Sequence, residues 1–121
     1  NAPPTTEIYT EDASSAASDV YKRQQEVLSM KATADLQVIP LGSGVSARKE
    51  VKRAVELLKQ HDFILHTHGA GTNIEGDIDE VLAAVKEIHE VLHEEGSVRL
   101  ISYLKLETRT DKETTLAGKR L

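Results

Sequence analysis

The pattern of apolar residues predicts an α+β domain in which two helices cover one face of a four-stranded antiparallel sheet. Apolar and polar residues alternate over 31–42 and over 97–109, as they do in strands that bury one face. Residues 46–61 and 77–96 instead repeat apolar side chains at helical spacing. Two shorter strand-like segments lie between these helices, so the order is strand, helix, strand, strand, helix, strand. That order is typical of the ferredoxin-like sandwich.

The first strand is predicted from an alternation that ends at two turn-forming residues. Pro40 and Gly42 interrupt the strand pattern and mark its end. The side chains expected to face the helices are Ala32, Ala34, Leu36 and Val38. The opposite face then carries Thr33, Asp35, Gln37 and Ile39.

Both helices carry an apolar stripe that we expect to pack on the sheet. In the first helix the stripe consists of Val51, Ala54, Val55 and Leu58. In the second it consists of Ile78, Val81, Leu82, Val85, Ile88 and Leu92. Asp77, followed three residues later by Glu80, predicts a capping box at the start of the second helix, and Gly96 predicts its end.

Two short strands, 62–69 and 72–75, are expected between the helices, joined by a Gly-Ala-Gly turn. The sequence GAGTNIEG at this point matches neither the dinucleotide-binding glycine pattern nor a P-loop. We therefore expect a hairpin whose glycines adopt positive φ angles.

Strand parity assigns the residues of the second short strand to the two faces of the sheet. Thr72 and Ile74 should face the helices, whereas Asn73 and Glu75 should point to the open face, which is the face opposite the helices. Once the open face is covered, for example in an oligomer, a carboxylate on it needs a donor partner. For Glu75, a structural salt bridge and a ligand contact both meet that need.

The last strand, 97–109, directs Tyr103 and Lys105 to the open face and ends in alternating charges. A solvated strand end is the default expectation for Arg109 and Asp111. The alternatives are that they pair at the turn or reach a neighbouring subunit. Residues 111–121 are predicted to form a final helix that stops early.

Length and composition limit the kinds of protein that this chain can be. At 121 residues it has room for one domain with a true core. A formal net charge of -5 gives no electrostatic support to a nucleic-acid partner, and the chain has no cysteine. No apolar run is long enough to span a membrane. We expect a cytoplasmic protein that acts on neither nucleic acid nor membrane.

The first 29 residues have the composition of a disordered leader rather than of a folded element. Within them, SSAASDVYKRQ (14–24) is the in-frame translation of a widely used sequencing-library adapter, and TTEIYT fits the flanking adapter segment. We therefore interpret residues 1–24 as translated adapter rather than natural protein. Residues 30–121 are taken as the single functional domain.

The stretch HEVLH (89–93) spells H-E-x-x-H, the pattern of two zinc-binding histidines with a glutamate as general base. Such a hydrolase needs a third ligand and an open cleft. No histidine follows His93, and His89 lies within the apolar stripe. We expect no catalytic residue and no metal site, with His89 turned towards the sheet. A zinc hydrolase is the least favoured alternative.

Four stretches, LQVIPLGSG, GTNIEGDIDEV, KEIHEVLHEEGSVRL and KLETRTDKETT, together resemble the thiamine-binding protein family related to YkoF. The resemblance covers about residues 31–120. The positions that match the family pattern are Thr72, Glu75, Gly76, His89, Arg109, Asp111 and Lys112. Pro40, Gly42 and Gly71 lie within the same stretches and are counted with the structural motif.

The resemblance implies a ferredoxin-like fold, dimers or tetramers assembled through sheet faces and edges, and binding of thiamine or its pyrimidine moiety without known catalysis. Hydroxymethylpyrimidine is therefore a second candidate ligand, and no cofactor is required. The candidate ligand-binding residues are Gln37, Thr72, Asn73, Glu75, Tyr103, Lys105 and Arg109. The alternative from another class is a structural or regulatory module whose exposed sheet only mediates assembly.

Overall fold

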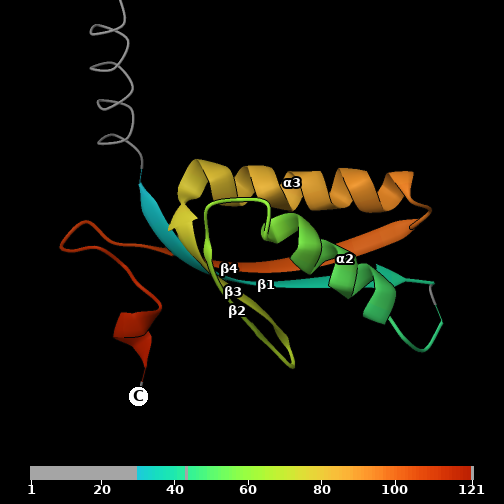
Figure 1. Cartoon of the computed structure of the whole chain (residues 1–121), viewed down its shortest axis with the longest axis horizontal. Coiled ribbons are helices and arrows are strands. Elements are labelled where there is room, and N and C mark those ends of the chain that lie inside the picture. The colour runs from blue at the N-terminus through green and yellow to red at the C-terminus, as the bar shows by residue number, and fades with distance from the viewer. Residues whose placement is uncertain (1–29, 43, 121) are drawn as a thin grey trace, which may run out of the picture. The chain divides into compact units, whose positions relative to one another are not determined.

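The predicted order of strands and helices is confirmed by a computed structural model that describes residues 30–42 and 44–120. Four antiparallel strands form one sheet in the order β2–β3–β1–β4. Both helices lie on the same side of this sheet, while the C-terminal end lies on the other (Figure 1). This is the arrangement of a ferredoxin-like sandwich. The predicted leader, residues 1–29, lies outside the described residues.

The central pair of strands is longer than the hairpin beside it. The strands are β1 (Lys31–Leu41), β2 (Ile64–His68), β3 (Gly71–Asp77) and β4 (Arg99–Thr108). β4 accompanies β1 almost from end to end, whereas β3 follows β1 only as far as the pair between Leu36 and Thr72. Over the described part of the chain, β1 therefore has no strand partner on its β3 side beyond Leu36. β1 ends just before Gly42, whose φ is +82°, as predicted for that glycine. Pro40, predicted to mark the end as well, lies within the strand opposite Leu100.

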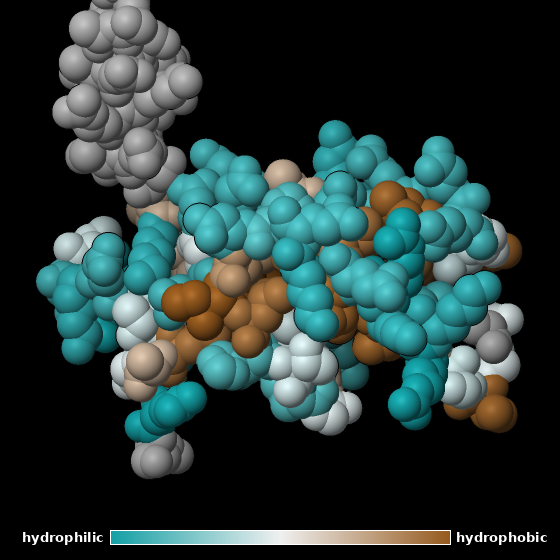
Figure 2. All heavy atoms as spheres, in the orientation of Figure 1, coloured by the Kyte–Doolittle hydropathy of each residue, from teal (hydrophilic) through white to brown (hydrophobic). Residues whose placement is uncertain are grey.

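The hydrophobic core lies between the sheet and the helices α2 (Arg48–Leu58) and α3 (Ile78–Glu94). Apolar residues gather in this layer, and hydrophilic residues cover the outer sides of the helices (Figure 2). The predicted inward face of β1 is confirmed, since its alternate apolar residues are buried from Ala32 to Leu36. The largest fully buried side chains are Leu58, Ile74, Ile88, Leu92 and Val81.

The predicted helix stripes are partly wrong at their edges. Val51 on α2 is 40% exposed and Leu82 on α3 is 47% exposed. The buried positions are taken instead by Leu57 and by Ala84. The stripe is therefore displaced around each helix, and the small side chain at position 84 lets α3 pack closely on the sheet.

Both ends of α3 are capped by local hydrogen bonds. Asp77 Oδ2 accepts from the N–H groups of Asp79 and Glu80, as the capping-box pattern predicts, but the Glu80 carboxylate contacts His61 instead of returning to the cap. At the other end, Gly96 has a φ of +113° and donates its N–H to the His93 carbonyl, while Ser97 donates to Leu92. These two bonds form a Schellman motif, which needs the positive φ at Gly96.

The predicted final helix over 111–121 is wrong: the segment contains one 3-10 turn, η1 (Ala117–Lys119). The residues before it are held by side chains of the sheet. Thr114 is buried against Thr33, and the Leu116 N–H donates to Glu75. These contacts occupy the backbone and side-chain groups that a helix start would use, so the segment follows an irregular path across the open face.

The expectation that the hairpin glycines adopt positive φ angles is also wrong. Among the described glycines, positive φ occurs at Gly42, Gly44 and Gly96. Gly76 is required for a different reason, because a Cβ there would lie 2.5 Å from the Phe63 ring. The Phe63 ring packs directly on the β3 backbone at this point.

A histidine holds the connection between α2 and β2 against α3. The His61 ring stacks on Phe63, with centroids 5.1 Å apart. Its Nδ1 lies 3.0 Å from Glu80 and its Nε2 lies 3.0 Å from Glu87. Only the imidazolium form donates hydrogen bonds to both carboxylates at once, and these hydrogen bonds to Glu80 and Glu87 raise the pKa of His61.

Across residues 30–42 and 44–120, no helix combines the length and the apolar content that a bilayer crossing requires.

The His61 contacts predict a pH-dependent stability. Because the folded state raises the pKa, the stabilisation is fully present below the ordinary value of 6.5 and is lost as the pH rises through the folded-state value. His61→Gln should therefore lower Tm most near pH 5.5 and least near pH 8.5, on the order of a few degrees at acid pH. Thermal unfolding across this range measures it.

The exposed imidazole of His66 on β2 supplies the matched control. His66→Gln should leave the pH dependence of Tm as in the unmodified protein. A His61→Gln deficit of equal size at both ends of the pH range would contradict the ion-pair explanation.

Candidate functional site

A cavity of about 350 Å³ opens between α2, β1 and the β2–β3 hairpin. Its apolar wall is formed by residues of α2, among them Val51, Ala54 and Val55, and by Leu36 and Val38 of β1. The hairpin tip from Thr67 to Thr72 forms the opposite wall. Ligand pockets in proteins commonly enclose about 300–1,000 Å³ with mostly apolar walls and a few polar groups. The cavity has the size and character of a small-ligand site.

The cavity exists because β3 is shorter than β1. Four consecutive β1 residues, Leu36 to Ile39, line it, although alternate residues of a strand point to opposite faces. A space that touches all four must therefore lie beside the edge of the strand. That edge is where β3 stops accompanying β1.

Two of the candidate ligand-binding residues, Gln37 and Thr72, come together in the lining of this cavity. Thr72 is buried, and its hydroxyl lies 3.5 Å from that of Thr67 in the neighbouring strand. Gln37 belongs to the exposed part of β1. The cavity thus combines an apolar wall with hydroxyl and amide groups that are able to donate and accept hydrogen bonds.

The hairpin tip is fixed beside β1 by a hydrogen bond that crosses β3. His68 Nδ1 accepts from the Ala70 N–H at 3.2 Å, so Nε2 carries the proton and donates to Asp35 at 3.1 Å. The crossing requires Gly71, because a Cβ there would lie 2.7 Å from the Leu36 carbonyl oxygen and 3.0 Å from the Asp35 carboxylate. The sequence analysis did not predict this pairing of Asp35 with His68. The only signal for it was that strand parity places both residues on the open face.

The other five candidate residues lie outside the lining of this cavity. Asn73 borders a smaller hollow of about 200 Å³ on the open face, together with His66 and the C-terminal residues Leu116, Lys119 and Arg120. Tyr103, which is 62% exposed, pairs with Gln37, and Lys105 pairs with Asp35 across the β1–β4 ladder. They remain predicted contacts of the open face.

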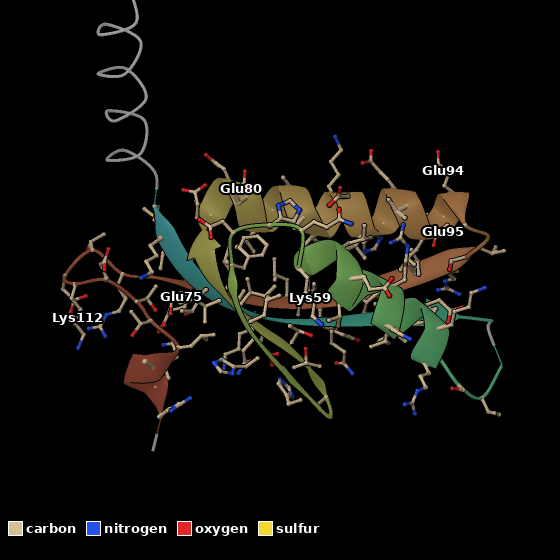
Figure 3. The ribbon with its side chains drawn as sticks, viewed as in Figure 1. Lys59, Glu75, Glu80, Glu94, Glu95 and Lys112 are labelled. Carbon is tan, nitrogen blue, oxygen red and sulfur yellow. The ribbon has the colours of Figure 1, made fainter. Side chains whose placement is uncertain are left out.

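Glu75 is buried where the C-terminal segment crosses the sheet (Figure 3). Its carboxylate accepts from the Leu116 N–H at 2.8 Å and lies 3.1 Å from Lys31 Nζ. Burial opposes its ionisation, but the Leu116 hydrogen bond and the Lys31 ammonium outweigh this effect and lower the pKa of Glu75. A salt bridge and a ligand contact were both expected for Glu75, and the structure shows the salt bridge, with Lys31.

Glu107 makes a second attachment for the same segment. It accepts from the hydroxyls of Thr114 at 2.8 Å and Thr33 at 3.3 Å, and it pairs with Lys119. The Lys119 and Thr114 hydrogen bonds lower the pKa of Glu107 to about 2. Residues 114–119, which we call the C-terminal strap, are thus tied to one end of the open face by two carboxylates.

The charged strand end forms a local pair rather than a solvated array. Arg109 Nε donates to Asp111 Oδ1 at 2.8 Å, which agrees with the alternative that these residues fix the turn. This pairing with Arg109 lowers the pKa of Asp111. Lys112 lies at the outer end of the same turn (Figure 3). The Arg109 guanidinium is therefore engaged within the chain.

The two histidines of HEVLH contact different parts of the chain. His89 Nε2 lies 2.6 Å from the Ser102 hydroxyl of β4, which confirms that this ring faces the sheet. His93 Nδ1 donates to the Ser97 carbonyl at 2.7 Å, beyond the end of α3. Within the described residues, no three His, Asp or Glu side chains gather in a metal-binding group. Both imidazole rings are therefore held by hydrogen bonds within the chain.

The strap contacts predict the effect of removing one carboxylate. Glu75→Ala removes the acceptor of the Leu116 N–H and the partner of Lys31, so the strap should open more often. We expect hydrogen exchange at the Leu116 amide to accelerate about tenfold or more. Glu90→Ala removes an exposed carboxylate of α3 and should leave that rate unchanged. Equal exchange rates in both variants would show that Glu75 does not hold the strap.

Comparison with known proteins places the chain in a family. The family model for thiamine-binding proteins matches residues 34–120. The UPF0045 protein MJ1052 of Methanocaldococcus jannaschii is 43% identical over 89 residues, which cover 74% of this chain and 88% of that protein. The UPF0045 protein sll0230 of Synechocystis is 41% identical over 100 residues, covering 83% of each.

The solved structures agree with the fold. The crystal structure of the Methanocaldococcus jannaschii protein has a TM-score of 0.70 and 42% identity, covering 74% of this chain and 92% of that one. A Thermotoga maritima protein, provisionally assigned to thiamine biosynthesis or salvage, has a TM-score of 0.65 and 22% identity, covering 74% and 94%. At that identity, the second match supports the fold alone. The family match and the identity to UPF0045 proteins confirm the resemblance, and the chain belongs to the thiamine-binding protein (UPF0045) family.

Proposed function

We propose that this protein binds thiamine or a related pyrimidine such as hydroxymethylpyrimidine, without catalysing a reaction on it. The observation that carries the proposal is the cavity of about 350 Å³ beside the edge of β1, in a chain of the thiamine-binding family. Its walls offer apolar surface for a flat ring, and its rim offers Gln37, Thr67 and Thr72 for the polar atoms of that ring.

The chemistry of thiamine suits this part of the sheet. The aminopyrimidine has apolar ring faces and an edge of alternating donors and acceptors, whereas the thiazolium carries a positive charge. Asp35, which is hydrogen-bonded to His68 of the cavity lining, and Tyr103, the cross-strand neighbour of Gln37, would supply an anionic and an aromatic group for the thiazolium. Asn73, Glu75, Lys105 and Arg109 remain candidate contacts from the sequence.

We propose that the protein acts in the cytoplasm, with no catalytic residue, no metal and no cofactor. We propose no nucleic-acid partner and no membrane partner. The ligand itself is the only small molecule that the site is expected to hold.

We further propose a homodimer or homotetramer assembled through the open face and the strand edges. Ile39 lies opposite Ile101 on this face, and Gln37 lies opposite Tyr103. The C-terminal strap contacts the end near Glu75 and Glu107, so within the described residues of one chain it leaves this apolar pair uncovered. The same observation favours the second candidate function, an assembly module without a physiological ligand.

The binding proposal predicts that a bulky side chain in the cavity blocks the ligand. Val51→Trp places an indole in the α2 wall, and we expect it to weaken thiamine and hydroxymethylpyrimidine binding at least tenfold. Leu82→Trp is the matched control, because Leu82 is similarly exposed but lies on α3 outside the cavity lining. Isothermal titration calorimetry of each ligand into the full chain measures the affinity.

The two candidate functions differ in the outcome of this titration. A measurable heat with the unmodified protein and with Leu82→Trp, but not with Val51→Trp, supports ligand binding. No heat with either ligand at millimolar concentration would reject it in favour of the assembly module.

The assembly proposal predicts that a charge on the open face separates the subunits. Tyr103→Asp places a carboxylate that would have to be buried beside the Ile39–Ile101 pair on association. We expect the molar mass from light scattering to fall to that of one chain. Leu82→Asp, on the helix side, should leave the mass unchanged. A single-chain mass for the unmodified protein would overturn the proposed assembly.

A further inference from the structure

The free edge of β1 offers backbone hydrogen-bonding groups beside the cavity. β3 stops at the pair between Leu36 and Thr72, while β1 continues to Leu41 alongside β4. An uncovered strand edge presents a row of unpaired N–H and C=O groups. Which residues present them follows from the direction of the Leu36 carbonyl.

The Leu36 carbonyl points towards β3, because its oxygen lies 2.7 Å from the position a Cβ would take on Gly71. The N–H and C=O of one strand residue point to the same side, and successive residues alternate. Val38 therefore directs both its N–H and its C=O to the free edge. Pro40 comes next on that side, and its missing N–H costs no ladder bond at an edge.

Val38 also lines the cavity, and its backbone pair points to the same edge of β1 along which the cavity lies. Apolar side chains of α2 line the same cavity, and among the described residues no hydrogen bond to the Val38 N–H or C=O from outside the β1–β4 pair is present. A backbone pair beside an apolar cavity has a strong requirement for partners when water is displaced.

The geometry points to Val38 as the residue that recognises the pyrimidine: its N–H donates to a ring nitrogen of the ligand, and its C=O accepts from the adjacent exocyclic amino group. An aminopyrimidine carries this acceptor and donor side by side, which matches the donor and acceptor of one extended residue. The ring then lies along the edge of β1 in the position of the missing β3 residues. This inference rests on the proposed function and names the group that selects the ligand.

A second copy of the chain is the competing occupant of this edge. Strand addition uses a run of alternating donors and acceptors. Here the run is interrupted at Pro40, two residues after Val38, and its other end is closed by Gly71 and Thr72. One complete donor–acceptor pair is enough for a small planar ligand but short for a strand ladder, so the edge favours the ligand.

The first test removes the Val38 N–H. Val38→Pro deletes the donor without breaking the β1–β4 ladder, because that N–H points away from β4. We expect hydroxymethylpyrimidine binding, measured by calorimetry, to weaken about tenfold or more relative to Val38→Ala. Val38→Ala also removes the branched valine side chain but keeps the donor. Equal affinities of the two variants would overturn the assignment.

The second test uses the unmodified protein, so it does not depend on the folding of a variant. Saturating hydroxymethylpyrimidine should slow hydrogen exchange at the Val38 amide about tenfold or more, while the amide of Leu82 should not respond. The analogue in which a carbonyl oxygen replaces the exocyclic amino group places an acceptor against the Val38 carbonyl, and should bind at least tenfold more weakly.

The outcomes separate this inference from the proposed function. If neither pyrimidine nor thiamine binds at all, the proposed function fails. If hydroxymethylpyrimidine binds while the Val38 amide keeps its exchange rate, or if the carbonyl analogue binds equally well, the function stands and the role of Val38 is overturned. Protection of the Val38 amide that rises with protein concentration in the absence of ligand would show that a second copy occupies the edge.

Discussion

The unequal length of the strands is the constraint on which the rest of the structure depends. β1 and β4 form a long antiparallel pair, and the β2–β3 hairpin covers only the first part of β1. The uncovered part leaves a strand edge beneath α2, and the side chains of that helix close the space above it. The cavity is therefore a consequence of where the hairpin stops, and it needs no insertion or extra domain.

Two close backbone approaches hold the hairpin in this position. At Gly71 the missing side chain lets Asp35 and His68 meet across β3, which fixes the hairpin tip beside the cavity. At Gly76 it lets the Phe63 ring lie on β3, beneath the His61 imidazole. Both glycines lie in the stretch GTNIEG, which is part of the resemblance to the family. Their role here is spatial rather than conformational, because neither has a positive φ.

The open face is divided between two uses. At one end, Glu75 and Glu107 hold the C-terminal strap through Leu116, Thr114 and Lys119. The pairs of Ile39 with Ile101 and of Gln37 with Tyr103 lie at the other end, away from the strap contacts among the described residues. A buried carboxylate such as Glu75 thus has its donors within the chain, while the remainder of the face is the part that the proposed association would use.

The sequence by itself determined the order of strands and helices, the inward face of β1, the family, and the orientation of His89, because periodicity and local motifs are properties of neighbouring residues. Which candidate residues share a site was decided by the tertiary structure alone. Gln37 and Thr72 meet in the cavity because the register of β3 ends there, whereas Glu75 turns to the strap and Arg109 pairs with Asp111. Parity gave the face of each residue, but register and the path of the last segment depend on contacts between residues far apart in the chain, which no local pattern records.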